Sequence, residues 1–429
     1  MNRKAPLAAV IMFALIICAN AEEGVNRKAA EYFKQASEYA ARNDWPRAID
    51  CLLNAKDLAP GEKEITKGLA VYYNNWAMQL GDSGDLDVAR EKLEKALTYD
   101  GQNRIIKTNL ANYLLRKAQL EYKNGYTDSA INTIRESLEA DPENVNGYMT
   151  LGDIYYETDD FEKAALNWRQ ARKLDPAIEG VDTRFAKLKK EEAVEAKFRE
   201  RVGPYFKIKF DTTRDESVVY NISDKLAEAY RDIGSYFAYY PKQPTTVIIY
   251  TPEQFETATS RSAGTLGLYD GKMRLRLTDL TQADSRLKKL IYHEYAHAVV
   301  SGLYPKNIPV WLHEGIAGWA ADPDHKLSAG EKALLKNLIS SGRLKKFYEL
   351  NGYFSGSAPQ QDLAAAYLES ELFVRYFVRR YNCYYLKSLL SELASGNTFE
   401  QSVYNVLKID LNRINSDFIE YLNECCRLP

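Results

Sequence analysis

The sequence predicts a helix-rich α+β protein in which an α-solenoid of helical hairpins precedes a domain with a small mixed sheet and a C-terminal α-subdomain. Three observations support this fold class. One segment recurs four times within the first 180 residues, short apolar runs alternate with amphipathic stretches after residue 204, and the pattern is almost entirely helical after about residue 325. Hydrophobic residues form 45% of the 429-residue chain, which is enough for two cores.

The charge balance of the chain argues against partners that bind through bulk electrostatics. The formal net charge is −2, which gives no general attraction to nucleic acid or to anionic membranes. The sequence also lacks a glycine-rich phosphate loop and the context of a nucleophilic serine. We therefore expect no nucleic-acid partner.

The first residues, MNRKAPLAAVIMFALIICANA, have the layout of a secretory signal. A basic start precedes an apolar run that is too short to span a bilayer comfortably, and small residues follow it. We expect a signal peptide at residues 1–21, cleaved after Ala21, and hence an exported protein, periplasmic or secreted, without a stable membrane span. Two alternatives stay open: a membrane anchor that is never removed, and a lipid attached through Cys18.

Four alanines mark an internal repeat in the first half of the chain. Ala48, Ala89, Ala130 and Ala164 lie in similar segments, 41, 41 and 34 residues apart, and a proline or glycine that stops a helix follows each of them about twelve residues later. Such units stack as helical hairpins, so we expect a solenoid over residues 22–180. The two longer spacings exceed the third by seven residues, or about two helical turns, which predicts longer helices in those units.

The last unit, YMTLGDIYYETDDFEKAALNWRQARKLDP, resembles a tetratricopeptide repeat. The resemblance implies a two-helix hairpin in which Gly152 and Ala164 let the helices approach, while Tyr155 and Trp168 fill the space between neighbours. Stacked repeats would present a concave surface for a protein partner, and a spacer role is the alternative. The characteristic positions of the repeat are occupied by Tyr148, Leu151, Gly152, Tyr155, Ala164, Trp168, Ala171 and Pro176.

A charged run, RFAKLKKEEAVEAKFRERVG, follows the repeats. We interpret residues 181–203 as a connecting helix that lays an apolar stripe on the repeats. Lysines and glutamates alternate on its other positions, so a basic binding patch is not expected. The apolar residues at helix-like intervals are Phe185, Leu188, Ala193, Ala196 and Phe198.

Residues 204–429 form the second predicted domain. YFKIKF alternates like a strand, VVYNISDKLAEAYRDIGSYF has a helical period, and TTVIIY is typical of a buried strand, closed by a turn at Thr251 and Pro252. GLYDGKMRLRL is expected to be a further strand, and a helix is expected from about Asp284 to Ser301. The helices after about residue 325 would pack behind that helix as an α-subdomain and form the far wall of a cleft.

The segment LIYHEYAHAVVSG, inside the expected helix, carries two of the chain's four histidines. Because His293 and His297 are four residues apart on a helix, they point the same way and can reach one ion. Glu294 then lies beside the ion and contacts its bound water. This is the H-E-x-x-H arrangement of zinc peptidases; an inert helix is the alternative.

A catalytic zinc commonly takes a third protein ligand and keeps one position for water. In IPVWLHEGIAGWA, Pro309 is expected to start a second helix, and Glu314 emerges from its first turn. We predict Glu314 as the third ligand. His313 is the competing choice: the two side chains point about 100° apart on a helix, so both cannot easily bind the same ion. His325 lies among loop-like neighbours and is expected at the surface. Three small residues are expected to let the second helix pack closely on the first: Gly315, Ala317 and Gly318.

HEYAH followed by IPVWLHEGIAGWA resembles the gluzincin metallopeptidases, in particular the peptidase MA-like family, which is often fused to tetratricopeptide repeats. The likeness runs from about Tyr205 to Tyr381 and implies a thermolysin-like zincin fold. Tyr367 matches the family's later tyrosine, although a packing role is the alternative. The resemblance implies one Zn²⁺ per chain held by His293, His297 and Glu314, with Glu294 as the catalytic base and Tyr367 stabilising the oxyanion.

These features predict a zinc endopeptidase that acts on a protein or peptide substrate. Aminopeptidases of the gluzincin group carry a glutamate after Gly-x-Met to hold the substrate's free amine, whereas Arg274 follows Met273 here. We therefore do not expect exopeptidase action, and we expect substrate backbone to pair with the strand GLYDGKMRLRL. Gly318 stands where some gluzincins have an aspartate that orients a histidine, so either another group does this or the site is weaker. The alternative function is a non-catalytic repeat scaffold or peptide-binding adaptor whose peptidase domain holds zinc.

Overall fold

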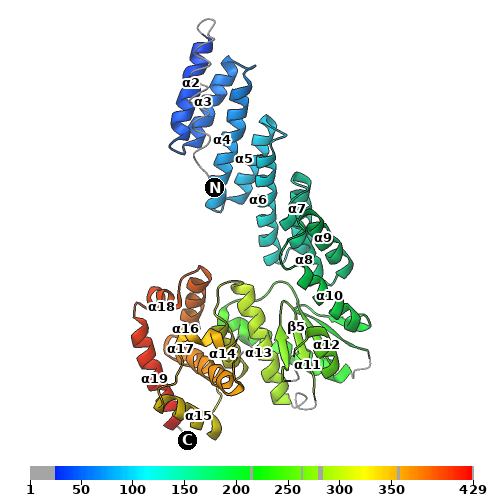
Figure 1. The fold of residues 1–429 in the computed structure, drawn as a ribbon, viewed down its shortest axis with the longest axis vertical. Coiled ribbons are helices and arrows are strands. Elements are labelled where there is room, and N and C mark those ends of the chain that lie inside the picture. The colour runs from blue at the N-terminus through cyan, green and yellow to red at the C-terminus, as the bar shows by residue number, and fades with distance from the viewer. Residues whose placement is uncertain (1–24, 213–215, 262–263, 279–283, 355–357, 428–429) are drawn as a thin grey trace. The chain divides into compact units, whose positions relative to one another are not determined.

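The computed structural model describes residues 25–212, 216–261, 264–278, 284–354 and 358–427 (Figure 1). The chain divides into two compact units, residues 1–181 and residues 182–429. The signal peptide predicted for residues 1–21 lies outside the described residues. Within the ranges above, no helix is long and apolar enough to cross a membrane.

The first unit is a stack of helical hairpins, as the repeat predicted (Figure 1). Each hairpin joins a first and a second helix through a short turn, and consecutive hairpins lie side by side. The helices are α2 (Val25–Ala40) with α3 (Trp45–Leu58), α4 (Lys63–Asp82) with α5 (Leu86–Tyr99), α6 (Arg104–Lys123) with α7 (Thr127–Ala140), and α8 (Val145–Glu157) with α9 (Phe161–Leu174).

Helix lengths explain the unequal repeat spacing. The second helix has 14 residues in each of the four hairpins. The first helix has 20 residues in α4 and α6 but 13 in α8. The seven-residue difference is two turns of helix, or about 10 Å of length. The prediction of longer helices in the two 41-residue units is confirmed.

The interior of each hairpin depends on small residues that the repeat pattern identified. Ala48, Ala89, Ala130 and Ala164 are all 0% exposed. In the last hairpin, a Cβ added at Gly152 would lie 2.4 Å from the indole Cδ1 of Trp168, and this contact leaves no room for a side chain.

The connecting segment differs from its prediction. Helix α10 (Val181–Glu195) ends eight residues before position 203, and β1 (Phe198–Val202) forms instead. Val194 and Phe198 pack with Ile248 and Tyr250 in the second unit. The prediction of one helix through residue 203, with its stripe on the repeats, is therefore wrong over this part. Pairing with the neighbouring strand outweighed the local helical period.

The second unit contains the small mixed sheet that was predicted. Its order is β1-β2-β3-β5-β4, with parallel pairing of β2 to β3 and of β3 to β5 and antiparallel pairing at both edges. The segment expected as one strand is a hairpin, because Gly271 adopts a φ of +98° in a tight turn. The remaining strands are β2 (Phe206–Asp211), β3 (Thr245–Tyr250), β4 (Gly267–Tyr269) and β5 (Met273–Arg276).

Helices cover both faces of this sheet. Side chains from α11 (Glu216–Phe237) and α13 (Asp284–Leu303) share a core with alternate residues of β2, β3 and β5. The opposite residues of the strands face α10 and α12 (Pro252–Thr259). Thr251, expected in a closing turn, instead caps the N-terminus of α12.

The C-terminal part of the second unit is helical, as expected. Gly315 and Gly318 make close contacts there, but with a different helix from the predicted one. A Cβ at Gly315 would lie 2.4 Å from the carbonyl oxygen of Ser370, so the two glycines make room for α17 rather than for α13. The helices are α14 (Val310–Ala321), α15 (Ala329–Ser340), α16 (Phe347–Tyr353), α17 (Gln360–Ala394), α18 (Phe399–Leu407) and α19 (Leu411–Arg427).

Candidate metal centre

Helix α13 turns two imidazoles to the same side. Ile291, Tyr295 and Val299 recur every fourth residue and are fully buried in the core of the second unit. His293 and His297 lie on the opposite side of the helix and keep part of their surface exposed. Their Nε2 atoms are 3.3 Å apart, so both imidazoles present the same nitrogen to one point.

Helix α14 brings a carboxylate to this point. The Oε2 atom of Glu314 lies 3.5 Å from His293 Nε2 and 3.6 Å from His297 Nε2. Two ligands that are each about 2.0–2.1 Å from a tetrahedral zinc lie about 3.3–3.4 Å from one another. The three separations therefore fit a single zinc ion, and the ligand atoms all lie within 4.8 Å of one another.

The charges within the cluster favour an ionised carboxylate beside the imidazoles. Burial opposes the charge of Glu314, but hydrogen bonds to His293 and His297 hold the pKa of the carboxyl well below its ordinary value. Burial would likewise lower the pKa of His293, yet the hydrogen bond to Glu314 and nearby carboxylates leave it raised. Two nitrogens and one anionic oxygen are a donor set that suits Zn²⁺.

Glu294 lies next to the cluster but is not one of its three donors. The side chain is 5% exposed, and burial raises the pKa of its carboxyl against the opposing charges of the two imidazoles. Strand β4 passes directly over it: a Cβ at Gly267 would lie 2.3 Å from Glu294 Oε1. Because β4 is an edge strand of the sheet, an extended peptide paired with it would be held beside Glu294.

Tyr367 stands on α17, and the charges of Glu314 and Glu294 reach its phenol. The ring is 42% exposed and makes an edge contact with Phe354, at a centroid distance of 4.9 Å. Burial, followed by the charges of Glu314 and Glu294, raises the pKa of the phenol to about 12. The hydroxyl therefore stays protonated at neutral pH and lies within electrostatic reach of both carboxylates.

His313 is outside the donor cluster, although it was the competing choice for the third ligand. Its Nδ1 atom lies 2.7 Å from Nδ1 of His297, which is the ring nitrogen that faces away from Glu314. Burial and then the charge of His297 lower the pKa of His313 to about 4. The imidazole is therefore neutral at physiological pH.

His325, expected at the surface, is held between two acidic side chains. Its Nδ1 lies 2.9 Å from Glu371 and its Nε2 lies 3.4 Å from Glu331. Arg375 also donates to Glu371 and to the backbone oxygen of His325. The side chain is 22% exposed, so His325 is a partly exposed residue that contacts α15 and α17, and its neighbours in sequence do not reveal these contacts.

Glu371 occupies the space that Gly318 leaves open. Its Oε2 lies 3.2 Å from the position of a Cβ at Gly318, and its charge contributes to the raised pKa of His293. The sequence predicted that another group would replace the missing carboxylate on α14 but did not identify it. The one available signal was the spacing of Tyr367 and Glu371, which places both on one side of α17. Nothing in the local sequence marked Gly267.

Arg274 lies away from the donor cluster. It is 1% exposed and lies on the other side of the sheet, where its guanidinium contacts Glu191 at 2.6 Å, Asp270 at 3.1 Å and Glu195 at 3.5 Å. Tyr250 accepts a further hydrogen bond from it at 2.7 Å. This residue therefore joins the sheet to α10.

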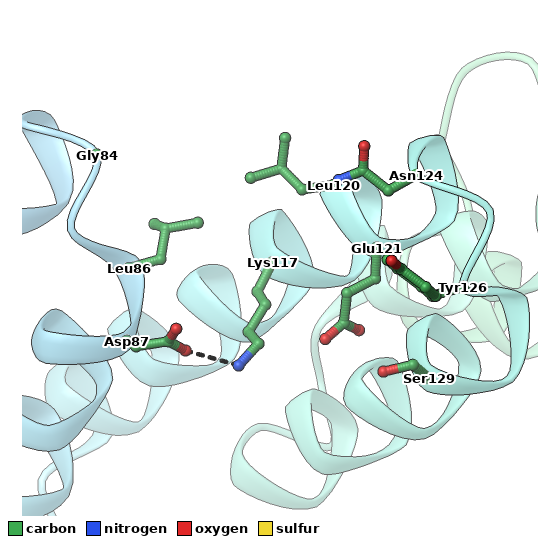
Figure 2. A pocket seen from close by; sticks show the side chains of 9 residues that line it. All are labelled: Gly84, Leu86, Asp87, Lys117, Leu120, Glu121, Asn124, Tyr126 and Ser129. Atoms are coloured by element: carbon green, nitrogen blue, oxygen red, sulfur yellow. Dashed lines mark hydrogen bonds and ion pairs between the residues drawn. The ribbon is translucent and has the colours of Figure 1, made fainter. Parts of the chain in front are cut away.

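The first unit contains a pocket of about 410 Å³ between two successive hairpins (Figure 2). Leu86 and Leu120 approach it from α5 and α6, and an ion pair of 2.6 Å joins Asp87 to Lys117 across it. The lining residues are Gly84, Leu86, Asp87, Lys117, Leu120, Glu121, Asn124, Tyr126 and Ser129.

Comparison with known families agrees with this division of the chain. Residues 279–424 match the Peptidase MA superfamily, and residues 115–177 match the tetratricopeptide repeat. No curated protein matches the sequence. The first match contains the whole donor cluster, and the second runs from the middle of α6 to just beyond α9. The chain therefore combines a domain of the peptidase MA superfamily with tetratricopeptide repeats.

Proposed function

We propose that this protein is a zinc-dependent endopeptidase in which His293, His297 and Glu314 hold one Zn²⁺ and Glu294 is the general base. The observation that supports it best is the convergence of three donor atoms with separations of 3.3, 3.5 and 3.6 Å. A buried carboxylate outside the donor set lies next to them. A closed structural site would use a fourth protein ligand, whereas the donor cluster has three among the residues that the structure describes.

The chain's own groups account for the proton transfers of peptide hydrolysis. A bound Zn²⁺ would lower the pKa of a water to about 7 and polarise the scissile carbonyl. Glu294 takes the proton of the attacking water and gives it to the leaving amine; its raised pKa makes the carboxylate a stronger base. Tyr367, which stays protonated, donates to the oxygen on which negative charge develops.

Two features favour cleavage within a chain over removal of terminal residues. Strand β4 stands at the edge of the sheet, where an extended peptide can bind by backbone pairing. Arg274, at the position where an amine-binding glutamate would be expected, is buried on the opposite side of the sheet. The residue at this position therefore cannot bind the free amino group of a substrate.

Zinc binding should depend on Glu314. We expect the wild-type protein to bind one zinc ion and Glu314→Gln to bind it at least about 100-fold more weakly, since the loss of an outer hydrogen-bond partner alone costs 10–100-fold. Chelator competition measures both affinities. Glu331→Gln is the matched control, because Glu331 also contacts a histidine but lies outside the cluster. Equal affinities for wild type and Glu314→Gln would rule out the assigned ligand.

Position 267 should be intolerant of any side chain. We expect Gly267→Ala to displace Glu294 or β4 and to lower kcat/KM for peptide cleavage by about 100-fold, the usual cost of a shift near 1 Å. Zinc content should not change. Gly264→Ala is the control, because a Cβ there meets nothing within 4 Å. Unchanged kinetics of Gly267→Ala would show that the close contact with Glu294 has no role in catalysis.

For the first unit we propose docking of a protein partner or substrate. Its support is the tetratricopeptide match and the pocket between α5 and α6. We also propose export, on the pattern of residues 1–21 alone.

A further inference from the structure

A third imidazole contacts the far side of a proposed zinc ligand. His313 precedes Glu314 in α14, and its Nδ1 lies 2.7 Å from Nδ1 of His297. The two rings lie at a centroid distance of 4.9 Å with an interplanar angle of 28°. The other nitrogen of His313, Nε2, is 3.4 Å from Oγ of Ser301, which stands one turn after His297 on α13. His313 therefore contacts two consecutive turns of α13.

The donor cluster determines where the protons of this pair must lie. His297 turns Nε2 toward His293 and Glu314, so this nitrogen has to be unprotonated when it holds a cation. The proton of the neutral ring is then on Nδ1. Two nitrogens 2.7 Å apart share one proton, so His313 Nδ1 must accept it. His313 then carries its own proton on Nε2, on the side of Ser301.

We propose that His313 is the positioning residue for His297: it accepts the Nδ1 hydrogen bond and thereby sets the tautomer and the ring orientation needed for metal binding. The inference rests on the proposed function of the cluster as a zinc site. Ligating histidines usually donate their second N–H to a carboxylate, a carbonyl or water. Here a neutral imidazole is the acceptor, and because it adjoins Glu314 in α14, one helix supplies both a ligand and the support of another.

Two substitutions separate the acceptor from the imidazole ring. His313→Leu keeps an apolar volume but removes the acceptor, and we expect it to weaken zinc affinity by about 10–100-fold, the usual effect of losing such a partner. His313→Asn places an amide oxygen at the δ position, where it accepts the same hydrogen bond. We expect this variant to retain most of the wild-type affinity. Chelator competition measures the affinities, and the visible spectrum of the Co²⁺-substituted proteins reports ligand geometry.

Each outcome supports or overturns the proposal. A perturbed Co²⁺ spectrum and weak zinc binding in the leucine variant only, with melting temperatures near that of wild type, support it. Equal affinity of the leucine variant and wild type overturns it. So does equal weakness of both variants, which would show that the imidazole ring itself is needed and not the hydrogen bond that it accepts. Failure of the proposed function gives a different result. If the wild-type protein binds zinc but cuts no peptide, the proposed function fails, while the zinc affinities of wild type, His313→Asn and His313→Leu still test the role of His313.

Discussion

Replacing Glu294 by glutamine is expected to abolish peptide hydrolysis while zinc stays bound and the fold is retained. Glutamine has nearly the same shape but cannot accept the proton of the attacking water. A positioned general base typically contributes about 10²–10⁴-fold to the rate. We therefore expect kcat to fall by at least about 10²-fold. Because Glu294 is not among the three donor atoms, metal affinity should remain close to that of the wild type.

Cleavage of a denatured protein and of a peptide library, measured beside zinc content, tests this expectation. Sequencing the products also separates the possible activities, since internal fragments indicate endopeptidase action and single amino-terminal residues indicate an aminopeptidase. Wild-type rates in Glu294→Gln would disprove the assigned mechanism. A wild-type protein that is loaded with zinc but inactive on the library, and whose repeats retain a stable partner, would favour the adaptor function.

Replacing Arg274 by methionine is expected to destabilise the second unit by about 3–5 kcal/mol, the typical cost of removing one partner of a buried ion pair. Arg274 and Glu191 are 1% and 0% exposed, and their contact measures 2.6 Å. Methionine fills part of the volume but supplies no charge. Glu191 also contacts Lys272, but at the longer distance of 3.9 Å.

Urea unfolding measures the loss in the free energy of unfolding. Hydrogen exchange of the native proteins shows where in the fold the loss occurs. The amides of β3 and β5 should exchange faster, because α10 is attached to the sheet through these contacts. Arg413→Met is the matched control: its partner Asp417 lies at 2.9 Å, but the arginine side chain is 66% exposed, and such surface pairs contribute about 0–1 kcal/mol. If both variants unfold at the same urea concentration, the buried network does not stabilise the sheet.

Sequence reasoning succeeded where the relation between residues lies within one helix. The four-residue spacing of His293 and His297 fixes their common direction, and the structure brings their Nε2 atoms within 3.3 Å. In the same way, seven extra residues per repeat predicted the 20-residue helices α4 and α6. Glu314 was reached by a weaker argument, since its approach to the histidines requires α14 to pack on α13.

Sequence reasoning failed where a contact joins separate elements. Phe198 fits a helical period, yet it lies in β1 because β2 offers an edge to pair with. For His325, whose side chain remains 22% exposed, the loop-like neighbours gave no sign of its contacts with Glu331 and Glu371. In both cases the deciding partner is far away in the chain or belongs to another element, so no local pattern could reveal it.

The sequence by itself determined the two-part organisation, the helical repeat and the metal-binding residues proposed for α13, because backbone geometry fixes the directions of side chains a few residues apart. Only the tertiary structure decided that Gly267 adjoins Glu294, that Glu371 fills the space beside Gly318 and that His313 supports His297. These are contacts between elements, and they depend on how helices and strands pack, which follows from the burial of the whole core and not from any short segment.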